Sequence, residues 1–188
     1  MSASLLATID RMRAAGCQVY PVQADCADDG ALSVALSGLI RETGSSVNHV
    51  IHCAGSLDAI AWQDVTERDI ARLLHGKAKG AVALLRHLSK ASLKSCLFMG
   101  SASALLTPPG HSLYAAANGF LDALAEEARE NGLPCLTIHW GVWETAGAAD
   151  AVAQFRALGL PLLPVDAGLD MAHRLVAVGD SLTHGFMS

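Results

Sequence analysis

Residues 97–120 read LFMGSASALLTPPGHSLYAAANGF, and this stretch contains the transition on which the predicted fold rests. An apolar run ends at Ser101, a loop with two prolines and a glycine follows, and an alanine-rich helical pattern begins near Ser112. Apolar runs that alternate with longer helical patterns are typical of βαβ units and a parallel sheet. The stretch also places Tyr114 thirteen residues after that serine and four residues before Asn118.

The same alternation continues on both sides of this stretch. The expected strands cover residues 17–23, 48–53, 95–100 and 135–140, and the expected helices cover 3–15, 30–43, a long segment from Thr66 to Leu88, 112–131 and 166–177. Thr66 and Asp69 form a capping-box pattern at the start of the long helix. Residues 144–164 are expected to form a mobile excursion with a short helix. The pattern predicts one α/β domain with a parallel sheet.

Composition excludes several classes of protein. The chain has 188 residues, of which 52% are hydrophobic, so it can bury one sizeable core. A net charge of -5 provides no basic surface for nucleic acid, and no apolar run reaches the roughly 20 residues that span a bilayer. The five cysteines are an odd number without metal-type spacing, as expected for reduced thiols. We therefore expect a cytoplasmic protein without a metal site.

Lys77 lies on the apolar side of the long helix. It falls four residues after Leu73 and four before Ala81, whereas Lys79 points to the other side. A lysine at such a position is paired or functional, or it extends its ammonium from the edge of the core to water. The spacing alone leaves both interpretations open.

Tyr114, Asn118 and Ser101 are expected to meet near that lysine. Tyr114 and Asn118 share the inward face of their helix, and Ser101 ends a strand, where parallel α/β sheets have their ligand crevice. Taken singly, an inward tyrosine is usually a core residue and a strand-end serine is usually a cap or turn residue.

The combination with Lys77 favours carbonyl reduction. An ammonium about 4 Å from a phenol contributes roughly 4 kcal/mol at an effective dielectric constant of 20, which makes a phenol a better proton donor. A serine hydroxyl can hold the carbonyl oxygen, and an asparagine can orient the lysine or a water that returns the proton.

These residues resemble the ketoreductase domain of modular polyketide synthases, within the short-chain dehydrogenase/reductase superfamily. The segments VIHCAG, YAAAN and FLDALAEEARENGLPCLTIHWGVW carry the resemblance, together with Lys77 on the preceding helix. Simpler members of the superfamily have Tyr-x-x-x-Lys, whereas these ketoreductases have asparagine in the second place, as at Asn118.

The resemblance implies a Rossmann-like doubly wound sheet with helices on both faces. It also implies NADPH-dependent reduction of a β-ketoacyl thioester, carried on an acyl carrier protein, in polyketide or fatty-acid-like biosynthesis. Tyr114 would donate the proton, Ser101 would bind the carbonyl, and Lys77 and Asn118 would support the tyrosine and its proton relay.

The same resemblance implies cofactor contacts. Tyr114 and Lys77 would hold the nicotinamide ribose. Trp140 and Gly141 belong to a W-G-P-W segment in which Val142 replaces the proline. The remaining contacts lie near the adenine (Asp25, Cys26) and beside the ribose (Cys53, Ala54, Gly55). Asp25, in DCADDG, also fits a simple turn residue.

The Gly-rich turn with which such reductases begin has no counterpart in this sequence. That turn follows the first strand and receives the cofactor phosphates at a helix N-terminus. We therefore expect residues 1–188 to form a partial ketoreductase domain that lacks the first βαβ unit, is inactive without it, and works with neighbouring synthase domains or a separate N-terminal segment. Two alternatives stay open: a catalytically inactive structural remnant of a synthase, and a free-standing short-chain reductase.

Overall fold

A computed structural model describes residues 2–144, 152–153, 156–157, 159, 161–178 and 184–186. The excursion expected at residues 144–164 lies largely outside the described residues.

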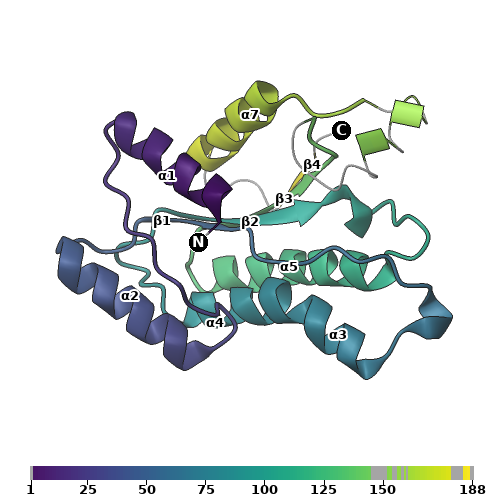
Figure 1. Cartoon of the computed structure of the whole chain (residues 1–188). Helices are drawn as coiled ribbons and strands as arrows, with labels where there is room; N and C mark the ends of the chain where they lie inside the picture. The colour runs from purple at the N-terminus through teal and green to yellow at the C-terminus, as the bar shows by residue number, and fades with distance from the viewer. Residues whose placement is uncertain are drawn as a thin grey trace.

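A four-stranded parallel sheet forms the centre of the fold. The strands are β1 (His49–His52), β2 (Ser95–Ser101), β3 (Cys135–Trp140) and β4 (His184–Phe186), in the spatial order β1-β2-β3-β4. Figure 1 shows α1 (Ala3–Ala14) and α7 (Val165–Val178) on one face of the sheet, and α2 (Asp29–Thr43), α3 (Glu67–Leu74), α4 (Gly80–Arg86) and α5 (Ser112–Glu130) on the other. The Rossmann-like fold with helices on both faces is confirmed.

The prediction of a strand at residues 17–23 is wrong. Residues 17–25 form neither a strand nor a helix, and β1 is paired only with β2 among the described strands. A strand needs a neighbour for its backbone hydrogen bonds, and no described strand lies beyond β1 to supply one. Pro21 also lacks the N–H that a ladder would use. The outer edge of β1 therefore remains unpaired, and Ile51 on this strand is 66% exposed.

Alternating side chains of the central strands divide the core into two layers. Buried residues of β2 and β3 that face α5 include Cys96, Phe98 and Cys135, which pack against Leu121. The intervening residues pack on the opposite face with α7, in a cluster formed by Leu97, Leu136, Ile138, Trp140 and Leu163. Both faces of these two strands are covered, as their almost continuous apolar sequence requires.

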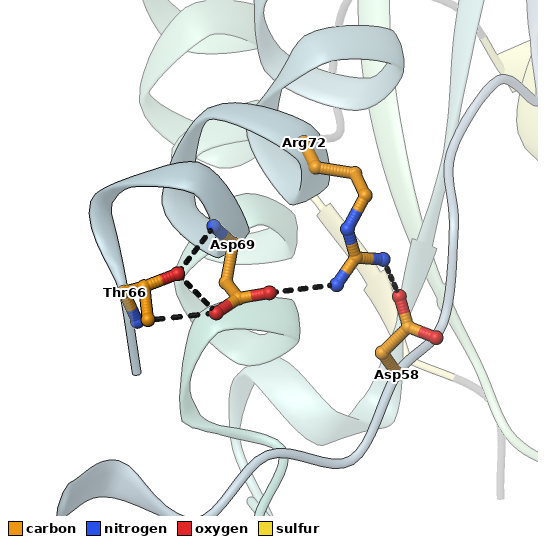
Figure 2. Close-up of polar contacts among 4 residues, drawn as sticks. All are labelled: Asp58, Thr66, Asp69 and Arg72. Atoms are coloured by element: carbon orange, nitrogen blue, oxygen red, sulfur yellow. Dashed lines mark hydrogen bonds and ion pairs between the residues drawn. The ribbon is translucent and has the colours of Figure 1, made fainter. Parts of the chain in front are cut away.

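The helix expected from Thr66 begins as predicted. The hydroxyl of Thr66 accepts from the N–H of Asp69 at 3.2 Å, and the Thr66 N–H donates to the Asp69 carboxylate at 3.1 Å. Arg72 then joins Asp69 to Asp58, so an ion pair ties the loop after β1 to α3 (Figure 2). The capping box is confirmed.

The same helix is not continuous, however. A π-helical turn over His75–Lys79 separates α3 from α4. A π turn inserts an extra residue, which shifts the face that the following helix presents to the core. Gly80 and Ala83 of α4 are buried alongside Ala81.

Candidate active site

The π-helical turn carries Lys77 into the protein. The side chain of Lys77 is only 6% exposed, and its Nζ donates a hydrogen bond to the main-chain carbonyl of Met99 at 2.9 Å. Nζ also lies 5.7 Å from the centroid of the Tyr114 ring. Burial lowers the pKa of Lys77, because desolvation penalises the charged ammonium. The lysine is therefore paired in the interior, beside the tyrosine, whereas Lys79 is exposed.

Gly55 makes room for this lysine. A Cβ at Gly55 would lie 2.9 Å from Cε of Lys77, closer than real Cβ atoms approach a neighbour. A Cβ at Gly76, in the π-helical turn, would lie 3.4 Å from the Gly55 nitrogen, which is an ordinary van der Waals contact. Glycine at position 55 is thus explained by a contact within this chain. The cofactor contact expected at Gly55 stays a prediction.

Two side chains from other segments form hydrogen bonds with main-chain carbonyls of the π-helical turn. Nε2 of His52 lies 3.0 Å from the carbonyl oxygen of Lys77, and because a carbonyl can only accept, Nε2 carries the hydrogen. Burial lowers the pKa of His52, which favours its neutral form. The thiol of Cys26 donates to the carbonyl of Gly76 at 3.7 Å. Sequence reasoning missed the role of His52, although its inward position in VIHCAG was a signal.

Asn118 is fully buried one helical turn after Tyr114. Its Nδ2 donates to the main-chain carbonyl of Tyr114 at 2.7 Å. Its Oδ1 is buried and has no hydrogen-bond partner among the residues that the structure describes. Nζ of Lys77 bonds to Met99 instead of to this amide. A buried acceptor without a partner is costly, so Oδ1 of Asn118 is a candidate to bind a water or a ligand group.

Ser101 ends β2, as the sequence predicted. Its hydroxyl oxygen accepts from the N–H of Ser103 at 3.2 Å and from the hydroxyl of Ser103 at 3.0 Å. Ser101 is therefore the cap of the short 3₁₀ helix Ala102–Ala104, as the simpler interpretation proposed. Both bonds use the oxygen as an acceptor, so the O–H of Ser101 remains able to donate.

The expected adenine contact Asp25 already has partners in this chain. Its carboxylate lies 2.8 Å from Nε2 of His75 and accepts from the Ala27 N–H at 2.9 Å. The hydrogen bond to His75, followed by that to Ala27, lowers the pKa of Asp25. The turn interpretation of Asp25 thus agrees with its geometry, and its carboxylate also connects residues 17–28 to the π-helical turn.

The other expected cofactor residues lie at the ends of β1 and β3. Cys53 and Gly55 are exposed just after β1, and Ala54 between them is half-buried. Trp140 is buried in the α7 layer, where its indole N–H donates to the Met99 sulfur at 3.2 Å. Its ring thus belongs to the core, and the half-buried Gly141 follows it at the sheet edge.

The described residues contain no group of three or more His, Cys, Asp or Glu side chains placed to bind a metal ion. No helix among them has both the length and the apolar character needed to cross a bilayer.

Comparison with known proteins gives consistent matches. A family model described as KR domain matches residues 2–145. The chain is 32% identical over 173 residues to polyketide synthase GfsA of Streptomyces halstedii, a match that covers 90% of this chain and 2% of that protein. The chain thus spans a small fraction of the length of this synthase.

Solved structures agree with the sequence match. PlmKR1, the ketoreductase from the first module of phoslactomycin biosynthesis in Streptomyces sp. HK803, superposes with a TM-score of 0.90 at 25% identity, covering 98% of this chain and 43% of that one. A short chain dehydrogenase from Burkholderia cenocepacia J2315 in complex with NADP superposes with a TM-score of 0.75 at 25% identity, covering 96% of this chain and 79% of that one.

Proposed function

The chain belongs to the ketoreductase (KR) domain family of the polyketide synthases, and from that premise we propose that it provides the catalytic half of an NADPH-dependent β-ketoacyl reductase. The observation that carries the proposal is the buried ammonium of Lys77 beside the ring of Tyr114. A buried lysine is costly to keep, because its charge loses hydration, and packing alone gives no reason for it.

Each of the four residues has a role in this proposal. Tyr114 donates a proton to the substrate carbonyl oxygen, and the free O–H of Ser101 holds that oxygen in place. The ammonium of Lys77 stabilises the negative charge that develops on the phenol oxygen as the proton leaves. Asn118 contributes its unpartnered Oδ1, a buried acceptor able to hold a water that returns the proton.

The donors around Lys77 fit the nicotinamide ribose of the cofactor. An ammonium has three N–H groups, and Met99 uses one of them, so two remain for ribose hydroxyls and the tyrosine oxygen. Bound NADPH would supply the hydride to the carbonyl carbon. Asp25, Cys26, Cys53, Ala54, Gly55, Trp140 and Gly141 are proposed to line the rest of its path.

The substrate proposal rests on the relatives. The chain matches a short portion of polyketide synthases, in which many domains share one polypeptide. We propose a β-ketoacyl thioester on an acyl carrier protein as the substrate, and neighbouring synthase domains as partners.

The test is an NADPH-oxidation assay of this chain supplied with a Gly-rich βαβ unit. We expect a β-ketoacyl thioester to accelerate NADPH oxidation well above the blank without enzyme. Rates equal to the blank would contradict the enzymatic function and favour a structural remnant. Faster turnover of a small free ketone than of the thioester would favour a free-standing reductase.

Replacing Lys77 with methionine is expected to lower kcat of this reaction. The ammonium stabilises the negative charge that develops on the phenol oxygen as the proton leaves, and methionine is unbranched like lysine but carries no charge. The measurement is kcat and KM with a β-ketoacyl thioester. Lys79→Met on the exposed side of the same turn is the matched control and should behave like the wild type. A wild-type kcat in Lys77→Met would mean that the lysine only packs.

A further inference from the structure

A pair of ionisable side chains lies behind Ser101, and the proposed reaction does not use it. His139 of β3 is 3% exposed. Its Nδ1 lies 3.0 Å from the main-chain carbonyl oxygen of Ser101, and its Nε2 lies 2.9 Å from Oδ2 of Asp122 on α5. The second oxygen of Asp122, Oδ1, is buried without a partner in the described part of the chain.

The hydrogen-bond partners fix the proton on one side of the imidazole. The Ser101 carbonyl can only accept, so Nδ1 of His139 carries a hydrogen. On the other side, either Nε2–H donates to the Asp122 carboxylate or a protonated Asp122 donates to Nε2. In both cases the pair holds one shared proton and has no net charge, which lowers the cost of burying it.

This arrangement differs from that of a hydrolase, although serine, histidine and aspartate are all present. A general base must reach the hydroxyl of the nucleophilic serine. His139 instead contacts the carbonyl of Ser101, while the Ser101 hydroxyl bonds to Ser103. The geometry therefore excludes His139 as the base that activates Ser101.

The surrounding sequence is adapted to this contact. A Cβ at Gly100 would lie 3.0 Å from Nδ1 of His139 and 2.9 Å from Cγ2 of Thr137, so a side chain there would push the imidazole away. Thr137 itself donates to the Leu121 carbonyl on α5 at 3.0 Å. Asp122 follows Asn118 by four residues on the same helix, so the contact connects the tyrosine-bearing helix to the end of β2.

We propose that His139 is a positioning residue for Ser101, oriented by Asp122. By holding the carbonyl of Ser101, the imidazole fixes the plane of the Ser101–Ala102 peptide, and with it the direction of the serine hydroxyl relative to Tyr114. The catalytic consequence rests on the proposed function. The positioning contact itself can be tested without turnover.

The first test reads the Ser101 carbonyl directly in the whole chain. Labelling serine with ¹³C at the carbonyl and alanine with ¹⁵N selects only Ser–Ala peptides, and the sequence has three: Ser2–Ala3, Ser101–Ala102 and Ser103–Ala104. His139→Leu removes the donor, so we expect an upfield shift of the Ser101 carbonyl carbon. His139→Asn is smaller than histidine but keeps an N–H near the position of Nδ1, so its Ser101 signal should stay close to that of the wild type.

The other two Ser–Ala signals serve as internal controls. A Ser101 signal that does not move in His139→Leu, or that moves equally in both variants, would overturn the proposal. The wild type supplies a second measurement in case the leucine variant does not fold. There, ¹⁵N spectra of the imidazole should show a protonated Nδ1, and an unprotonated Nδ1 would equally overturn the contact.

The second test asks whether His139 acts through Ser101. We expect His139→Leu to lower kcat by up to about tenfold, with KM changed less, since the hydroxyl orients the reacting carbonyl. Made in a Ser101→Ala background, the same change should lower kcat by less than about twofold, because residues that act as one unit are not additive. In Asp122→Asn, the side-chain amide can still donate to Nε2 of His139. This variant should therefore keep most of the activity that Asp122→Leu loses.

Equal losses of kcat in both backgrounds would show that His139 only supports the fold. A wild-type chain that does not reduce β-ketoacyl thioesters would refute the proposed function. The carbonyl signals would then still decide whether His139 positions Ser101.

Discussion

Tyr114→Phe is expected to lower kcat by about two to four orders of magnitude, the range that a positioned general acid supplies. The change removes only the hydroxyl that donates the proton. The aromatic ring remains for the contact with Lys77, whose Nζ lies 5.7 Å from its centroid, so the fold and the substrate KM should change little. The measurement is kcat and KM with a β-ketoacyl thioester, together with thermal unfolding of both proteins.

The chain offers a matched control for this variant. Tyr20 is its only other tyrosine, and it is exposed with its hydroxyl bonded to Gln18 at 3.2 Å. Tyr20→Phe should therefore leave kcat unchanged. Wild-type turnover by Tyr114→Phe would refute the role assigned to Tyr114.

The second large effect is expected when a Gly-rich βαβ unit is added to the chain, in cis or by co-expression. The outer edge of β1 is unpaired among the described strands, and Ile51 exposes 66% of its surface there. Unpaired edges favour aggregation, and a domain has only about 5 to 15 kcal/mol of stability to lose. Added strands would pair this edge, and the Gly-rich turn would bind the cofactor phosphates at a helix N-terminus.

Calorimetry, which measures the cooperativity of unfolding, and titration with NADPH, which measures its affinity, test this prediction. We expect the chain alone to unfold broadly and to bind NADPH weakly, whereas the chain with the added βαβ unit should unfold cooperatively and bind NADPH tightly. A βαβ unit whose turn glycines are replaced by alanine is the matched control, because it should restore cooperative unfolding without tight NADPH binding. A sharp transition with micromolar NADPH affinity in the chain alone would contradict the prediction.

Local patterns in the sequence were sufficient for the elements around the site. The apolar run that becomes β2, the inward face of α5 and the capping box at Thr66 depend on interactions within a few residues. Such interactions recur with the periods of strands and helices, so they can be recognised without the fold. For the same reason, the sequence placed Lys77 inside and Lys79 outside correctly.

The sequence failed where an element depends on distant partners. Residues 17–23 have the composition of a strand, but none of the described strands lies beside them to pair with, so their backbone forms no ladder. The three-residue strand β4 is too short to produce a pattern, and it exists because it pairs with β3. The π-helical turn at His75–Lys79 likewise interrupts a pattern that resembled one continuous helix.

The sequence by itself determined which helix faces carry Lys77, Tyr114 and Asn118, because side-chain direction follows from helix periodicity. It also placed Ser101 at the end of a strand, where the apolar run stops. Only the tertiary structure decided what these residues contact. Lys77 bonds to a carbonyl 22 residues away, and the Ser101 carbonyl faces an imidazole 38 residues away. Periodicity states that a side chain points inward, but the partner is set by the register of β2 against β3 and by how the helices pack on them, which local sequence does not encode.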